Sequence, residues 1–175
     1  MSTKAHKLAA PRSVKCKIIT VSDTRDKDSD KSGKLMIELL TGAGHEISDY
    51  VIVKDEAMAI RDAVIKGCET ADIDVVLTNG GTGIALRDVT IETVQKLFTK
   101  EISGFGELFR FLSYQEDIGS SAILSRAIAG VYHNKAIFST PGSTGAVRLA
   151  MSKLILPEIG HVVSELQKDL PGINL

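Results

Sequence analysis

The chain has 175 residues, of which 43% are hydrophobic, and this suffices for one domain with an ordinary core. Its formal net charge of -1 and its pI near 6.4 argue against a protein that binds nucleic acid through a basic surface. No apolar run approaches the ~20 residues that a membrane-spanning helix needs. We therefore expect neither a nucleic acid nor a membrane as a partner.

The N-terminal residues are polar and lack the apolar segment of a secretory signal. We expect residues 1–13 to form a flexible arm and residues 14–175 to form a single domain. Cys16 and Cys68 stand in apolar stretches far apart in the sequence, which predicts buried free thiols and a cytoplasmic location. The four histidines show no spacing typical of zinc ligands.

Strands and helices alternate along the chain. Apolar runs and periodicity predict strands at residues 15–21, 46–53, 73–78 and 135–139. The predicted helices span residues 33–40, 56–68, 89–98, 104–112 and 122–129, with a long closing helix from 146 that Pro157 should kink or interrupt. This alternation predicts an α/β fold, a three-layer sandwich in which helices cover both faces of a mainly parallel sheet.

The most informative segment is VVLTNGGTG at residues 75–83, an apolar strand that ends in three glycines and a threonine. Bare backbone N–H groups at a strand end, close to a helix N-terminus, bind phosphate well. The loop predicts a site for a nucleotide or a phosphorylated cofactor at Gly80, Gly81, Thr82 and Gly83. It matches neither the P-loop nor the dinucleotide fingerprint. A tight turn that needs glycine is the alternative.

Two other predicted strands also end in unusual loops. In open α/β sheets, ligands bind beyond the carboxyl ends of the strands. Ser22 and Asp23 follow the first strand, and a second glycine-bearing loop follows the strand at residues 135–139. Pro141, Gly142 and Ser143 in that loop form a second candidate anion cradle, with a plain turn as the alternative.

Carboxylates stand near these loops. Asp55 follows the second predicted strand, Asp88 follows the glycine loop, and Asp23 is a third candidate. Magnesium prefers one or two carboxylates together with substrate phosphates, so Asp55 and Asp88 are candidate metal ligands. Alternatively, Asp55 caps a helix, and Asp88 pairs with Arg87 or caps the helix at Thr90.

Taken together, these motifs resemble the molybdenum cofactor biosynthesis family, which includes the Mog proteins, the MoaB proteins and the G-type domains of gephyrin and its plant counterpart. The matching segments are TNGGTG at 78–83, RDVT at 87–90, GFGE at 104–107, LSR at 124–126 and PGS at 141–143. They occur in the same order as in the family. The resemblance extends over nearly the whole chain and is closest to the MoaB branch.

The resemblance implies a molybdopterin-binding-like fold and self-association as a trimer or a dimer of trimers. It also implies an activity, in which the terminal phosphate of molybdopterin attacks the α-phosphate of Mg-ATP to give adenylyl-molybdopterin and pyrophosphate. Asp55 and Asp88 would then be catalytic and bind Mg²⁺. The residues implied in binding the pterin or the nucleotide are Ser22, Asp23, Gly80, Gly81, Thr82, Gly83, Ser113, Ser125, Pro141, Gly142 and Ser143.

The chain departs from many adenylylating members at Ile91, where they have a proline after the RDVT motif. Proline at a first helical position preorganises the helix start, so its loss is tolerable. The presence of both Asp55 and Asp88 favours catalysis. The alternatives are a catalytically silent molybdopterin-binding paralogue, acting as a carrier or oligomeric partner, and another nucleotide-dependent enzyme that resembles the CinA proteins.

Overall fold

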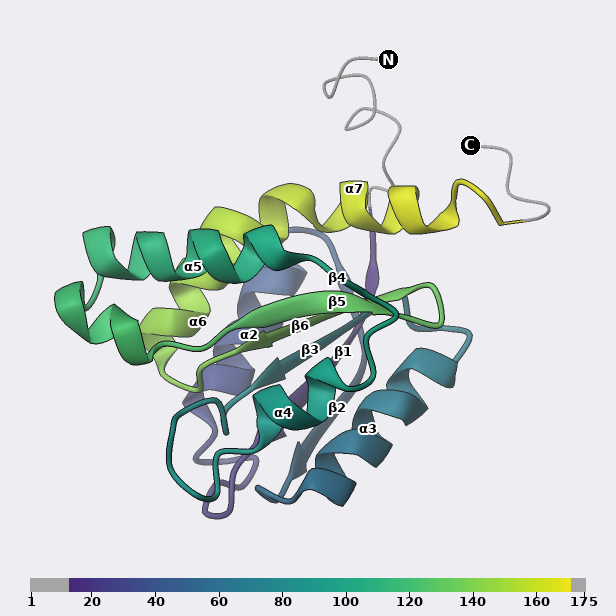
Figure 1. The fold of residues 1–175 in the computed structure, drawn as a ribbon. Coiled ribbons are helices and arrows are strands. Elements are labelled where there is room, and N and C mark those ends of the chain that lie inside the picture. Colours follow the sequence, from purple (N-terminus) through teal and green to yellow (C-terminus); the bar gives the residue numbers. More distant parts are fainter. Residues whose placement is uncertain (1–12, 171–175) are drawn as a thin grey trace.

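The computed structural model describes residues 13–170, so the predicted arm at residues 1–13 lies almost entirely outside the described residues. The sheet has six strands in the order β2-β1-β3-β6-β5-β4 (Figure 1). The first four in that order run parallel and are β2 (Glu46–Val53), β1 (Lys15–Val21), β3 (Val75–Asn79) and β6 (Lys135–Thr140). The predicted mainly parallel α/β fold is confirmed.

Two strands were not predicted, and the helix predicted at residues 122–129 is wrong. A 3₁₀ helix, η1 (Gly119–Leu124), precedes β5 (Ile128–Tyr132), which pairs antiparallel with β6 and with β4 (Lys100–Glu101). His133 and Asn134 have φ of 48° and 58°, as the two central residues of a tight hairpin turn require. The Phe98 ring packs on Gly130, where a Cβ would lie 2.4 Å from it. Gly130, which lies just beyond the predicted helix, thus allows β5 to pack closely against the Phe98 ring.

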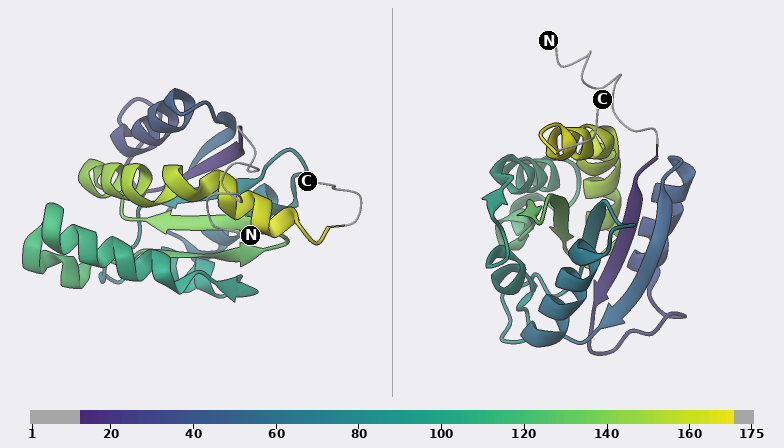
Figure 2. Two further views of the ribbon diagram at one scale, coloured as in Figure 1. Left: turned by 90° about the horizontal axis from the view of Figure 1, so that it is seen from above. Right: turned by 90° about the vertical axis from the view of Figure 1, so that its right-hand side faces the viewer.

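Helices cover both faces of the sheet. One face carries α2 (Lys31–Gly42), α5 (Ser103–Glu116), α6 (Thr144–Ala150) and α7 (Leu156–Gln167), and the other carries α3 (Ala57–Glu69) and α4 (Thr90–Gln95). Successive strand residues point to opposite faces, so Ile18 joins the first core and Ile19 the second. Figure 2 shows α5 and α7 side by side, seen from above.

The closing helix is interrupted near Pro157, as predicted. A π-helical segment, η2 (Met151–Ile155), separates α6 from α7. Proline has no N–H to donate, and its ring clashes with the carbonyl four residues earlier, so the regular hydrogen-bond pattern cannot continue through it. The wider turn of the π-helix accommodates this position.

Two further expectations concern the cysteines and the membrane. Cys16 and Cys68 are both free and buried, as predicted. Burial is the main cause that raises the pKa of each thiol to about 12. Between residues 13 and 170, no helix combines the length and the apolar character needed to cross a membrane.

Candidate functional site

The loops that follow β1, β3 and β6 meet at one edge of the sheet and surround a pocket of about 410 Å³. The predicted residues in its lining are Ser22, Asp55, Gly80, Gly81, Thr82, Gly83, Asp88, Ser125, Pro141 and Gly142. Parallel strands end at the same edge, which explains why segments far apart in the sequence come together here.

Close backbone approach explains the glycines of this pocket. Gly80 has a φ of 96°, and a Cβ on it would lie 2.3 Å from the carbonyl oxygen of Val21. A Cβ on Gly142 would lie 3.0 Å from the Cα of Gly80. The two predicted anion cradles are therefore packed against each other, and together they present bare backbone to one pocket.

The helix predicted from residue 89 begins at Thr90, but it ends at Gln95 rather than at residue 98. Residues 84–89 intervene before α4, which has only six residues. The backbone N–H of Thr90 donates to Gly81 O at 3.0 Å, and its hydroxyl donates to Gly80 O at 2.9 Å. The first residue of α4 thus braces the glycine loop, and the anion-binding capacity of the loop depends on its own backbone.

Asp55 lies beside the glycine loop. A Cβ on Gly81 would come within 2.8 Å of its Oδ1. Burial raises the pKa of the Asp55 carboxyl, and the negative charges of Asp23 and Asp88 raise it further. The N-cap of α3 is Glu56, and no side chain caps this helix. The alternative role of Asp55 as a helix cap is therefore not observed.

Asp88 lies at the other end of the same loop. A Cβ on Gly83 would come within 2.5 Å of its Oδ2, and this oxygen accepts a hydrogen bond of 2.9 Å from the backbone N–H of Ala85. Arg87 pairs with Asp23 instead, and the N-cap of α4 is Val89, without a side-chain cap. Neither alternative for Asp88 is observed, and its carboxylate lines the pocket.

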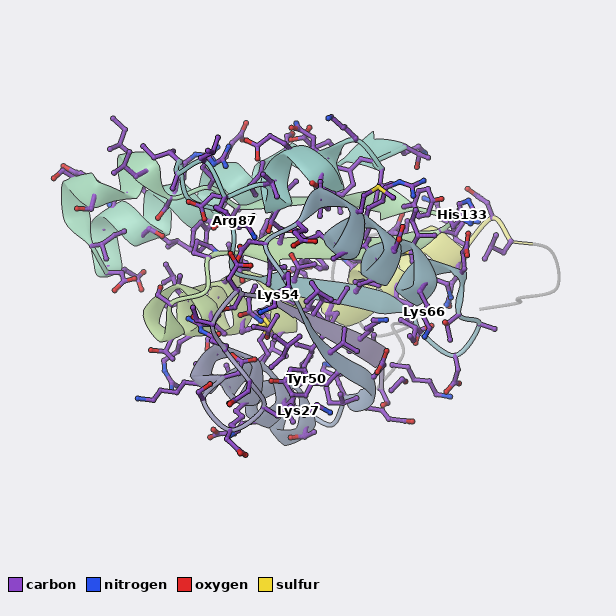
Figure 3. The ribbon with its side chains drawn as sticks, turned by 90° about the horizontal axis from the view of Figure 1, so that it is seen from below. Lys27, Tyr50, Lys54, Lys66, Arg87 and His133 are labelled. Carbon is purple, nitrogen blue, oxygen red and sulfur yellow. The ribbon has the colours of Figure 1, made fainter. Side chains whose placement is uncertain are left out.

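Asp23 lies outside the pocket lining and braces its edge. Its carboxylate accepts two hydrogen bonds of 2.8 Å from Arg87, and Oδ1 accepts one of 3.2 Å from the Asp55 backbone. The hydrogen bond from Arg87 lowers the pKa of Asp23. Lys54 donates to the Asp23 carbonyl, and Figure 3 shows Lys54 and Arg87 near each other. These contacts join the loop after β1 to the loops around Asp55 and Asp88.

Ser113 and Ser143 also lie outside the lining. Ser113 is 1% exposed within α5. Ser143 is exposed and caps α6, where its hydroxyl accepts a hydrogen bond of 3.2 Å from the Ala146 backbone. Ser143 thus caps a helix, Ser113 is buried within α5, and neither residue lines the pocket.

Two arginines in the lining were not among the predicted residues. Arg126 donates to Thr82 O at 2.9 Å and to Gly83 O at 2.6 Å, and it also pairs with Glu92. It therefore clamps the glycine loop. Its place in the LSR motif was the available signal. Arg25 also lines the pocket, but it lies in a highly charged stretch that, in the sequence, did not distinguish it from its neighbours.

A buried carboxylate lies next to Arg25. Asp30 is 0% exposed, accepts a hydrogen bond of 2.6 Å from the Tyr50 hydroxyl, and caps α2 through the Gly33 N–H at 3.0 Å. Ser32 Oγ lies 3.0 Å from Asp30 Oδ1. Burial alone would raise the pKa of Asp30, but hydrogen bonds from Thr20, Tyr50, Gly33 and Ser32 outweigh it and lower the pKa below 3.8.

This lowered pKa predicts a pH-dependent contribution to stability. The contribution is fully present above the unfolded-chain pKa of about 3.8 and is lost as the pH falls through the folded-state pKa. We expect Asp30→Asn to lower the free energy of unfolding at pH 7 by about 1–3 kcal/mol. This loss of stability should shrink as the pH falls below the unfolded-chain pKa of about 3.8. Urea unfolding of both proteins between pH 7 and the acid range below pH 3.8 measures the difference in stability. A difference that does not change with pH would contradict the prediction.

Comparisons with known proteins agree with this architecture. Residues 17–161 match the model of a family described as a probable molybdopterin binding domain. The chain is 62% identical over 169 residues to molybdenum cofactor biosynthesis protein B of Bacillus subtilis (strain 168), covering 97% of this chain and 99% of that one. The chain thus belongs to the molybdopterin-binding domain family of molybdenum cofactor biosynthesis.

Solved structures show the same relationship. A crystal structure of a molybdenum cofactor biosynthesis protein B has a TM-score of 0.89 and 62% identity, covering 91% of this chain and 99% of that chain. The tungsten cofactor synthesizing protein MoaB from Pyrococcus furiosus has a TM-score of 0.82 and 40% identity, covering 90% and 99%. The predicted membership in the MoaB and Mog family is therefore confirmed.

Proposed function

We propose that this protein adenylylates molybdopterin with Mg-ATP and releases pyrophosphate. The observation that carries the proposal is the juxtaposition of two carboxylates, Asp55 and Asp88, with a bare glycine loop in one pocket. The family supports the choice of pterin as acceptor, since its model is that of a probable molybdopterin binding domain. Relatives that share most of the chain are named for molybdenum cofactor biosynthesis.

The carboxylates fit a magnesium ion that arrives with its nucleotide. Among residues 13–170, no group of three or more His, Cys, Asp or Glu side chains is placed to hold a metal ion. Mg²⁺ is commonly bound by one or two carboxylates plus substrate phosphates, so a pair of aspartates is enough. The raised pKa of Asp55, caused by burial and by nearby Asp23 and Asp88, reflects a cluster of negative charge that a cation would relieve.

In the proposed reaction, an oxygen of the molybdopterin phosphate forms a bond to the α-phosphorus of ATP. The bond from that phosphorus to the β-bridging oxygen breaks, and pyrophosphate leaves with the electron pair. Asp55 and Asp88 would hold the Mg²⁺, which neutralises phosphate charge when bound. Gly80 and Gly81 allow the phosphates to approach the backbone, and Arg126 keeps the loop in place.

Pyrophosphate release from Mg-ATP, measured with and without molybdopterin, tests the proposal. Release that depends on the pterin supports adenylyl transfer. Tight molybdopterin binding without release would identify the alternative, a catalytically silent paralogue that acts as a carrier or oligomeric partner. The location that we propose is the cytoplasm, because two free thiols suit a reducing compartment.

We further propose that the chain self-associates through an apolar surface on α5 and η1. This α5–η1 patch consists of exposed side chains that are between 44% and 84% accessible: Leu108, Phe111, Tyr114, Ile118, Ile123 and Leu124. Monomeric proteins rarely expose a contiguous apolar patch of many large side chains without a function, and most soluble oligomers consist of identical chains. Leu124 also lines the pocket, so a second copy would border the site. This supports the trimer, or dimer of trimers, that the resemblance implies.

Replacing Phe111 with glutamate is expected to weaken self-association by on the order of 10²-fold or more, because a charge would be buried at the centre of the contact. Light scattering after size-exclusion chromatography measures the mass. Met58→Glu is the matched control, since Met58 is 65% exposed on α3, away from the α5–η1 patch. A Phe111→Glu protein with the mass of the unsubstituted oligomer would rule out the patch as the interface.

A further inference from the structure

The acidic side chains that line the pocket and Arg25 lie at different places along its glycine-bearing backbone. The carboxylates of Asp55 and Asp88 lie beside Gly81 and Gly83, whereas the guanidinium of Arg25 lies beside Gly142. A Cβ on Gly142 would lie 3.4 Å from Arg25 Nη1 and 3.0 Å from the Cα of Gly80. Arg126 also reaches the Gly83 end, where it donates to the Gly83 carbonyl and is paired with Glu92. The carboxylates that line the pocket therefore lie near one end of the bare backbone, and Arg25 lies near the other.

The Arg25 guanidinium is held in a defined position. Nη1 donates to the Ser32 hydroxyl at 2.6 Å, and Nη2 donates to the Gly142 carbonyl at 3.0 Å. The carboxylate of Asp30, which is 0% exposed, lies 3.5 Å from Nη1, while the Arg25 side chain is 34% exposed. The contacts fix the head group from inside the fold and leave part of it accessible to solvent. Between residues 13 and 170, no hydrogen bond engages its Nε.

The other nearby cations are committed elsewhere. Arg126 donates to Thr82 O and Gly83 O and pairs with Glu92, so four of its five N–H groups are engaged within the protein. Arg87 pairs through two hydrogen bonds with Asp23 and lies outside the lining. Within the described part of the chain, the lining contains no lysine. Arg25 thus keeps its Nε N–H and one Nη2 N–H for a ligand, whereas Arg126 keeps only one N–H, on Nη1.

We propose that Arg25 binds the phosphate monoester of the acceptor substrate, while the metal-bound phosphates of ATP lie against Asp55 and Asp88. A guanidinium binds a metal-free phosphate strongly through charge-assisted hydrogen bonds. Carboxylates repel such a phosphate unless a cation lies between them. The identity of the acceptor rests on the proposed function, whereas the anion site does not. The positions of these charged side chains would therefore set which substrate phosphate lies at each end of the pocket.

Binding of inorganic pyrophosphate in the presence of EDTA tests the anion site without metal or catalysis. Titration calorimetry should show binding to the unsubstituted protein that weakens by about tenfold or more in Arg25→Gln. Arg25→Lys keeps the charge but not the forked donor geometry, and should bind with intermediate affinity. The matched control is Arg61→Gln on α3, because Arg61 pairs with its neighbour Asp62. Equal affinities of Arg25→Gln and the unsubstituted protein, at equal Tm, would overturn the proposal, as would a lack of binding.

Steady-state kinetics then test which substrate Arg25 contacts. Arg25→Gln should raise the KM for molybdopterin by about tenfold or more and change the KM for Mg-ATP by less than about twofold. The opposite split would overturn the assignment of the two substrates. Pyrophosphate binding could depend on Arg25 while neither the unsubstituted protein nor the variant releases pyrophosphate from ATP. In that case the anion site stands and the adenylyltransferase proposal falls.

Discussion

Asp88→Asn is expected to keep the fold and to lower the rate of molybdopterin-dependent pyrophosphate release by on the order of 10²-fold or more. The asparagine oxygen can still accept the hydrogen bond that Asp88 accepts from the Ala85 backbone. The negative charge beside Gly83 is lost, however, and with it one of the two proposed Mg²⁺ ligands. The loss should therefore appear in turnover and in the Mg²⁺ concentration needed for half-maximal rate, while the Tm remains close to that of the unsubstituted protein.

Asp62→Asn is the control for this substitution. Asp62 lies on α3 with its side chain 64% exposed, and its ion pair is with the adjacent Arg61. The Asp62→Asn protein loses one negative charge at a position outside the pocket, so its turnover should equal that of the unsubstituted protein. An Asp88→Asn protein with the turnover of the unsubstituted protein would remove Asp88 from the proposed catalytic pair.

Gly80→Ala is expected to lower the free energy of unfolding by about 2–4 kcal/mol and to abolish nucleotide binding. Gly80 has a φ of 96°, which L side chains rarely adopt, and the new methyl group would lie 2.3 Å from the Val21 carbonyl oxygen. Relief of this contact requires the end of β1 to move away from the glycine loop. Urea unfolding and titration with Mg-ATP measure the two effects.

Gly42→Ala is the matched substitution for this experiment. Gly42 is the last residue of α2, and a Cβ on it would meet nothing within 4 Å. Alanine is favoured over glycine in helices, so this variant should gain up to about 1 kcal/mol. If both variants had the same stability, the close approach of β1 to the glycine loop would not explain Gly80.

The parts of the fold that follow from local pattern were predictable. The strand at 15–21 has the predicted bounds because its apolar run is buried in the parallel sheet. The strand at 46–53 also has the predicted bounds, although it lies at the edge of the sheet and is only partly buried, because it is rich in β-branched and aromatic residues. β5 escaped prediction because it has only five residues with a glycine at its centre, and its register depends on the hairpin with β6 and on the Phe98 ring. Those contacts come from other segments, so the segment itself does not contain the signal.

The candidate site also has a part that the sequence predicted and a part that it did not. The residues at strand ends were identifiable, since the rule that ligands bind beyond the carboxyl ends of strands applies to any parallel sheet. Ser113 was expected near the ligand, but it is buried in α5 and lies outside the pocket lining, because sequence similarity does not state which way a helix turns its residues. The environment of Asp55 was also undecided until the structure showed an uncapped α3 and a carboxylate beside Gly81.

The sequence by itself determined the alternation of strands and helices, the glycine loops and the family, because these are carried by neighbouring residues. Only the tertiary structure decided the position of Arg25. Its partners are Ser32 and the carbonyl of Gly142, which is 117 residues away in the chain. Such a contact depends on β1, β3 and β6 being neighbours in the sheet. Strand order is settled by the packing of the whole domain, and no local pattern of residues records it.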